Sequence, residues 1–316
     1  MKGSGQEIAD RRRLKRSVTI WRVGAILAFA AALLAFMGRS EFGDMPVERH
    51  IARISLEGIL VGETDILDTI AAVAEDEQAE ALIVYIDSPG GTSADAEAIY
   101  EALRKVAEKK PVVAQMGTVA ASGGYIAALA ADHIVARGNT LTGSIGVIMQ
   151  WTELEELFGK LGLEMRTVKS AVLKGEPDPF SDPSPEALAM TRALIDSSYD
   201  WFLGLVETRR EFSKEKARTL GDGSVFTGFQ AQANGLVDEI GGEETVLAWL
   251  ESEKKIDKSL AIYEYEPEPE SWGSGLFMDS MVQLAARFLG LEGVIENSAS
   301  PVSMNGLVSI WNPSLR

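Results

Sequence analysis

The chain has 316 residues, enough for a substantial hydrophobic core, and its net charge of −17 disfavours nucleic-acid partners, because an acidic surface repels phosphate groups. It has no cysteine, which excludes disulfides, thiol catalysis and thiolate metal sites. Its two histidines, His50 and His133, leave little material for a zinc or di-iron site, and we expect no metal and no other cofactor.

The first 22 residues form a basic segment, with seven Lys and Arg against Glu7 and Asp10. The apolar run that follows predicts a transmembrane signal anchor over residues 18–38, with Arg22 reaching back to the lipid headgroups. By the positive-inside rule the N-terminus stays in the cytoplasm and the acidic remainder lies across the membrane. A cleaved signal peptide is the alternative, but its small-x-small pattern, Ala28-Phe29-Ala30, lies inside the apolar run instead of after it.

A linker over residues 39–50 leads to alternating apolar and helical patterns, which predict a domain over residues 51–262. Alternating strands and helices favour a mainly parallel sheet with helical cover, an α/β fold. The expected strands are 82–86, 111–116, 133–136, 144–149 and 163–170; the expected helices are 92–110, 123–131, 151–162 and 185–216; turns are expected at 87–91 and 117–122.

The last segment, residues 263–316, combines an acidic, proline-containing linker with an amphipathic tail, "LFMDSMVQLAARFLGL". Its amphipathic stretch is compatible with a helix packed on the domain, with a partner-docking or membrane-surface helix, or with a frayed end. These alternatives stay open in the sequence.

Ser122, in "AASGG", is the first candidate for chemistry, because it stands between a predicted strand and a predicted helix. The Gly123 amide there can point at an oxyanion, although a helix-capping serine is the ordinary interpretation. Upstream, "DSPGG" (Asp87 to Gly91) follows a buried strand, and its two glycines let the backbone approach a ligand closely.

A nucleophilic serine needs a general base, and the sequence leaves more than one candidate. His133 begins a predicted core strand and is better explained as a structural residue. Lysine is the alternative, provided that it is held neutral, and "VKSAVLKGEPDPF" offers Lys169 and Lys174. Ser144, in an otherwise apolar segment, could hydrogen-bond a neutral lysine amine.

Four pieces together, "DSPGG", "GTVAASGGYIAALAADHIVARGNTLTGSIGV", "VKSAVLKGEPDPF" and "DGSVFTGFQAQANGLVDEIGG", resemble in content and order the short, single-domain form of the signal peptide peptidase A family. These are membrane-bound serine peptidases with a Ser/Lys dyad. The resemblance implies a crotonase-like (Clp-protease-like) spiral of βαβ units preceded by one N-terminal transmembrane helix. It implies the following site: nucleophile Ser122, general base Lys174, lysine-orienting Ser144, and oxyanion-hole amides of Gly91 and Gly123. Gly175 departs from the acidic residue that many members have there.

The same resemblance implies a substrate, an assembly and a location. The substrate would be the hydrophobic core of a released signal peptide, or another extended apolar peptide, cut through an acyl-enzyme. Chains would form a homo-oligomeric ring or dome in which neighbours complete each site, at the inner membrane of a bacterium with the catalytic domain on the periplasmic or extracellular side. Three alternatives are a related protease that cuts stomatin-like partners, a crotonase-like acyl-CoA enzyme, which the acidic body disfavours, and an inactive scaffold.

Overall fold

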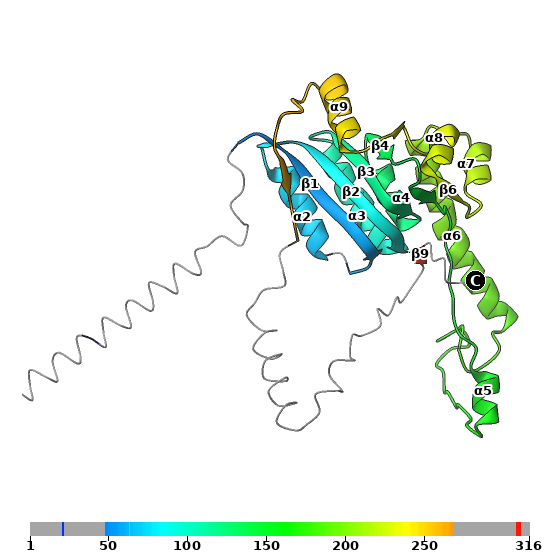
Figure 1. The fold of residues 1–316 in the computed structure, drawn as a ribbon. Helices are drawn as coiled ribbons and strands as arrows, with labels where there is room; N and C mark the ends of the chain where they lie inside the picture. Colours follow the sequence, from blue (N-terminus) through cyan, green and yellow to red (C-terminus); the bar gives the residue numbers. More distant parts are fainter. Residues whose placement is uncertain (1–20, 22–47, 63, 268–307, 311–316) are drawn as a thin grey trace, which may run out of the picture. The chain divides into compact units, whose positions relative to one another are not determined.

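A computed structural model describes residues 21, 48–62, 64–267 and 308–310 (Figure 1). The chain divides into residues 1–45 and residues 46–316, and the fold below belongs to the second unit. Apart from Trp21, the predicted anchor at 18–38 lies outside the described residues, as does the amphipathic stretch of the tail. Among the described residues, no helix combines the length and apolarity needed to cross a bilayer.

In the described part of the second unit the strands form one nine-stranded sheet, and its main path runs β6-β5-β3-β2-β1-β8. In addition, β4 pairs with β3 and β7, and β9 pairs with β2. The β5–β6 and β2–β9 pairings are antiparallel and the others parallel, which confirms the expected mainly parallel α/β fold. The strands are β1 (His50–Leu60), β2 (Ala79–Thr92), β3 (Val112–Ala121), β4 (His133–Ala136), β5 (Leu141–Gly143), β6 (Val225–Thr227), β7 (Glu239–Ile240), β8 (Ile262–Glu264) and β9 (Val308–Ile310).

Helices cover both faces of this sheet, so the central strands are apolar on both sides, as parallel sheets require. Along β2, Leu82 and Val84 belong to the larger core cluster, while Ala81 and Ile83 join the smaller one beneath α9. The helices are α2 (Thr64–Glu75), α3 (Ser93–Ala107), α4 (Gly123–Leu129), α5 (Glu155–Lys160), α6 (Pro185–Arg209), α7 (Lys214–Leu220), α8 (Gly228–Asn234) and α9 (Glu243–Lys254).

Several expected elements are confirmed. The run 82–86 lies inside β2, 133–136 is β4, and α4 begins at Gly123 as expected. Thr92 caps α3 by accepting a hydrogen bond from the Asp95 N–H, and Pro185 opens α6. Local patterns were sufficient here because capping and apolar periodicity act over a few residues.

Other expected elements are wrong, and the misses concentrate around the glycines. The predicted turn at 87–91 is strand, because β2 continues to Thr92, and the one at 117–122 is strand up to Ala121, where β3 ends, so that only Ser122 turns. Gly117, which suggested a turn, makes room instead: a Cβ there would lie 2.6 Å from the Tyr85 hydroxyl. The expected strands 144–149 and 163–170 are irregular apart from one isolated bridge, and the helix 185–216 is interrupted between α6 and α7.

A buried polar cluster ties the start of β1 to the chain after β8. The fully buried His50 lies 2.9 Å (Nε2) from the Tyr265 hydroxyl, which donates a hydrogen bond to Asp76. Burial alone would raise the pKa of Asp76, but hydrogen bonds from Tyr265 and the Gln78 N–H, with the charge of His50, hold that pKa below its ordinary value. The ionised form of Asp76 is therefore part of the folded state.

We expect Tyr265→Phe to lower the free energy of unfolding by about 1.5–3 kcal/mol at neutral pH, because it removes a hydrogen bond to a buried carboxylate. Since the folded pKa of Asp76 is depressed, this stabilisation is present above the unfolded pKa near ~4 and is lost as the pH falls through the folded value. Urea unfolding at pH 7 and pH 3 measures both effects. Tyr263→Phe, at a residue 43% exposed, is the control; an equal loss at the two pH values would contradict the expectation.

Candidate functional site

Ser122 occupies a sharp turn between β3 and α4. Its backbone has φ 55° and ψ −116°, its N–H donates to the Gly143 carbonyl at 2.9 Å, and it is 1% exposed. A capping serine normally has an extended backbone and accepts a hydrogen bond from the first turn, whereas the Ser122 side chain makes no capping bond. A strained serine on a strand-to-helix turn is instead the arrangement that presents a nucleophile.

This backbone strain predicts that different substitutions of Ser122 have different effects on the stability of the protein. We expect Ser122→Gly to be about 1 kcal/mol more stable than Ser122→Ala, because glycine adopts a positive φ without steric conflict. Urea unfolding of the two variants measures the difference. Ser252, inside α9, is the control, because within a helix glycine is expected to be less stable than alanine. Equal stability of the two Ser122 variants would show that the turn is unstrained.

Ser144 lies beside Ser122 because the strands that lead to them are paired. β3 and β5 run parallel with Ala121 opposite Gly143, so the two serines follow neighbouring strand ends. The Thr142 hydroxyl reinforces this pairing by donating to the Ala120 carbonyl at 2.6 Å. Ser144 itself has φ 49°, and its N–H donates to the Ser224 carbonyl at 2.8 Å. The structure thus brings both predicted serines to the same end of the sheet, where β3 and β5 terminate.

Gly91 lies on the neighbouring strand and is held tightly against β1. A Cβ at this position would lie 1.8 Å from the Leu60 carbonyl oxygen, so only glycine fits. The β2–β3 pairing has Ser88 opposite Ala120, and two residues further along each chain come Gly90 and Ser122. Gly91 and Gly123 therefore flank the Ser122 turn, at the end of β2 and the start of α4.

Ser88 is a site residue that sequence reasoning passed over. It is fully buried, its hydroxyl donates to the Gly58 carbonyl at 2.6 Å, and the same oxygen accepts from the Gly90 N–H at 3.1 Å. α4 packs directly on it, because a Cβ on Gly124 would lie 2.7 Å from the Ser88 carbonyl oxygen. The available signal was the serine within "DSPGG", read only as part of a turn. Ser88 thus positions the end of β2 with Gly90 and Gly91, called the glycine strand below, relative to Ser122.

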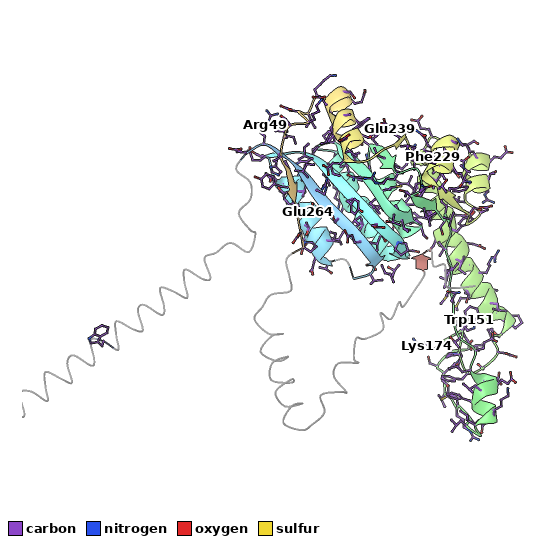
Figure 2. The ribbon with its side chains drawn as sticks, in the orientation of Figure 1. Arg49, Trp151, Lys174, Phe229, Glu239 and Glu264 are labelled. Atoms are coloured by element: carbon purple, nitrogen blue, oxygen red, sulfur yellow. The ribbon has the colours of Figure 1, made fainter. Side chains whose placement is uncertain are left out.

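The two candidate lysines lie on the segment between β5 and α6, which carries α5. Lys174 is exposed, and Figure 2 shows it on this segment, away from the sheet. Lys169 pairs with Glu176 at 3.0 Å and Asp178 at 3.4 Å, and the hydrogen bond to Glu176 raises the pKa of Lys169 above its ordinary value. A general base must be neutral, so these contacts disfavour Lys169. Lys174 remains the better candidate. Within one copy of the chain, however, it lies on this segment and not beside Ser122.

His133 belongs to a different end of the sheet. It pairs in register with Val113, eight residues before Ala121, which corresponds to about 26 Å along β3 at ~3.3 Å per residue. Its ring stacks on Trp249 with centroids 4.7 Å apart. This placement agrees with the structural role expected for His133. Within the described part of the chain, no group of three or more His, Cys, Asp or Glu side chains could hold a metal ion.

Sequence profiles of two known families match this chain. The profile of peptidase family S49 matches residues 104–257, which include Ser122, Ser144 and Lys174. The profile of Clp protease matches residues 61–140, in agreement with the Clp-like α/β fold expected from the motifs. Among solved structures, a membrane-bound stomatin-specific protease aligns with a TM-score of 0.48 at 15% identity, covering 70% of this chain and 100% of that one.

Curated proteins include relatives that cover most of the chain. A putative protease of Synechocystis sp. is 37% identical over 246 residues, which are 77% of this chain and 88% of the relative. A putative signal peptide peptidase of Enterococcus faecium is 30% identical over 258 residues, 76% and 75% of the two chains. With the Ser122 turn, the family profile and these identities in agreement, the chain belongs to peptidase family S49, the signal peptide peptidase A family of serine peptidases.

Proposed function

We propose that this chain is a membrane-anchored serine endopeptidase that degrades released signal peptides with a Ser122/Lys174 dyad. The observation that carries the proposal is the strained Ser122 turn, which lies between the glycine strand of β2 and Ser144. Ser122 Oγ attacks the scissile carbonyl while the neutral Lys174 amine takes its proton, and the Gly91 and Gly123 N–H groups stabilise the oxyanion. Lys174 then protonates the leaving amine, and water releases the acyl-enzyme.

The lysine in this proposal comes from a second copy of the chain. The segment that bears Lys174 exposes a set of large apolar side chains, of the kind that normally marks a protein interface: Ile148, Leu157, Leu161, Leu163, Met165, Val168, Val172 and Leu173. Val168 is fully exposed and Val172 is 79% exposed, so these two side chains near Lys174 are almost unpacked within the described part of this chain. Docking this segment on another copy buries those side chains and carries Lys174 to that copy's Ser122. A head-to-tail contact of this kind forms a ring when the rotation between successive copies closes, and a ring is the assembly we propose.

Burial at such an interface also supplies the chemistry that a lysine base requires. An amine in water is protonated at neutral pH, while apolar surroundings disfavour the ammonium form. The Ser144 hydroxyl can then accept or donate a hydrogen bond to hold the neutral amine toward Ser122. In this arrangement Ser144 is a positioning residue.

The proposed location is the inner membrane of a bacterium, with residues 18–38 as the anchor and the N-terminus in the cytoplasm. The support is the basic N-terminal segment followed by an uncharged apolar run. An anchored catalytic domain on the periplasmic or extracellular side remains where cleaved signal peptides accumulate. Enzyme and substrate then need to meet only at the membrane surface.

The substrate proposal is tested by cleavage profiling of the full-length protein in detergent micelles. We compare a signal peptide, a charged peptide of equal length and a stomatin-like C-terminal segment, and label the enzyme in parallel with a serine-reactive phosphonate. Cleavage within the apolar core of the signal peptide supports the proposal. Cleavage confined to the stomatin-like segment would contradict the substrate, and absence of both labelling and cleavage would favour an inactive scaffold.

A further inference from the structure

The helix α4, which follows the candidate nucleophile, is held at its far end by two arginines from other helices. Arg104 of α3 donates from Nη1 to the Ala130 carbonyl at 2.8 Å. Arg209, the last residue of α6, donates from Nε to the Leu129 carbonyl at 2.8 Å and from Nη2 to the Ala131 carbonyl at 2.9 Å. Two side chains therefore bind three consecutive carbonyls at the C-terminal end of α4.

These bonds meet a need that the sequence of α4 creates. The last carbonyls of a helix have no partner within the helix, and they need one from elsewhere when the helix end is buried. Every residue of α4 is buried, and so are Ala130 and Ala131, which follow it. The side chains of residues 126–131 are all hydrocarbon, so none of them can bond a carbonyl. The donors therefore come from α3 and α6.

The two cations are brought together at an electrostatic cost. Burial lowers the pKa of Arg209, and the nearby positive charge of Arg104 lowers it further. Because one cation or an uncharged donor can cap a helix end, a pair of neighbouring guanidiniums adds more than a partner for each carbonyl. The addition is orientation: the guanidinium is planar, and a fork bound to two carbonyls resists rotation of the helix.

The opposite end of α4 is the candidate site. The Ile126 N–H donates to the Ser122 carbonyl at 2.9 Å, so the first turn of the helix is continuous with the strained turn. Gly124 packs against β2, where a Cβ would lie 2.7 Å from the Ser88 carbonyl oxygen. With seven residues, α4 is only about 10 Å long at ~1.5 Å per residue, and so short a helix moves as one body. A shift at its C-terminal end therefore displaces Ser122 and the Gly123 amide.

Arg209 also joins α4 to the helix that follows the lysine segment. α6 begins at Pro185, directly after the segment that bears Lys174, and ends at Arg209. Leu203 and Val206, near the same end of α6, belong to the core cluster that contains α4. One anchor thus serves both the helix of the candidate nucleophile and the helix that leads from the candidate base.

We propose that Arg209, with Arg104 beside it, is a positioning residue for Ser122. It fixes the far end of α4 and so holds the Ser122 turn and the Gly123 amide in the geometry that attack on a carbonyl requires. The effect on hydrolysis rests on the proposed peptidase function; the effect on the turn itself does not. Since both arginines bind α4 at the end opposite Ser122, they act on the rate of acyl transfer and not on substrate binding.

The first test compares Arg209→Met with Arg210→Met in the full-length protein. Methionine fills space flexibly but donates no hydrogen bond. Arg210 is the matched control, because it adjoins Arg209 and its partners, the Gly235 carbonyl at 2.8 Å and Asp238, lie outside α4.

We expect Arg209→Met to lower kcat for a signal peptide by about 10- to 100-fold, because a small misplacement of reacting groups costs up to about 10² in rate. KM stays within about twofold, since substrate binding is untouched, and Arg210→Met keeps kcat within about twofold of the wild type. Urea unfolding identifies the temperature at which both variants are folded. An unchanged kcat in Arg209→Met, or equal losses in the two variants, would overturn the positioning role.

Arg209→Lys separates geometry from charge, and it keeps the test decisive if methionine prevents folding. Lysine retains the positive charge, but its single amine has no planar fork. We expect kcat to stay about fivefold or more below the wild type. Full recovery with lysine would show that the charge acts and not the fork, which contradicts the positioning role.

Hydrogen exchange reports on the turn without catalysis. The exchange rate is measured for the amides of residues 122–129, which include the Ile126 N–H that is bonded to Ser122. We expect these amides to exchange about tenfold faster in Arg209→Met than in Arg210→Met, while the other core amides exchange no faster. A uniform acceleration over the whole core would show a global loss of stability and overturn the local role.

The two measurements separate this inference from the proposed function. If exchange accelerates at α4 as expected while no form of the protein hydrolyses peptides, the positioning of the turn stands and the peptidase role of Ser122 fails. If hydrolysis depends on Ser122 while Arg209→Met changes neither kcat nor exchange, the peptidase role stands and the positioning role of Arg209 fails.

Discussion

A protein in which Ser122 is replaced by alanine is expected to lose peptide hydrolysis by ~10⁴- to 10⁶-fold, the scale seen when a serine peptidase loses its nucleophile. The physical reason is that, among the described residues, neither of the two other serines at the site has the same placement. Ser144 follows the neighbouring strand β5, and the Ser88 oxygen is already engaged by the Gly58 carbonyl and the Gly90 N–H. The measurement is kcat/KM for a signal peptide, together with covalent labelling by a serine-reactive phosphonate.

The Ser122→Ala protein keeps its fold, since alanine removes one oxygen and leaves the Gly143 and Ile126 backbone hydrogen bonds of this residue in place. Circular dichroism and urea unfolding verify this. Ser252→Ala, at an exposed serine of α9, is the matched control and retains wild-type activity and labelling. Phosphonate labelling that persists in Ser122→Ala would move the nucleophile to another serine and end the present assignment.

The second large effect concerns Lys174. We expect Lys174→Ala to lower kcat by about 10³- to 10⁴-fold, because the Ser122 hydroxyl then has no base to accept its proton. Lys169→Ala is the matched control in the same segment. Its ammonium is paired with Glu176 and Asp178, so its role is structural. We therefore expect Lys169→Ala to lower kcat less than tenfold. If Lys169→Ala were inactive while Lys174→Ala remained active, the assignment of the general base would be reversed.

Mixing the two dead variants tests whether the dyad crosses between copies. If Ser122 of one chain works with the lysine of a neighbour, unfolding and co-refolding Ser122→Ala with Lys174→Ala creates some sites with both wild-type residues. A random one-to-one mixture in a head-to-tail ring restores about one quarter of the wild-type activity. Each variant refolded alone stays inactive. A mixture that stays inactive, although the two variants co-assemble, would contradict a shared site.

The sequence by itself located the candidate nucleophile and its surroundings because the relevant signals are short. A serine among small residues, a glycine pair after a buried strand and a second serine in "LTGSIGV" are each local patterns. The family resemblance combined them in order, and the S49 profile confirmed the family. Helix starts at Thr92 and Pro185 were equally accessible, since a cap depends on neighbours within one turn.

The tertiary structure decided what depends on residues far apart in the chain. A positive φ at Ser122 is imposed by the β3–β5 register and the packing of α4 on Ser88, neither of which a local pattern encodes. Glycines read as turns proved to be close-contact positions inside β2 and β3, because only the neighbouring strand shows what a Cβ would strike. The placement of β9 beside Gly91 joins residues more than 200 apart, and strand pairing over that distance is set by which sheet edge remains open.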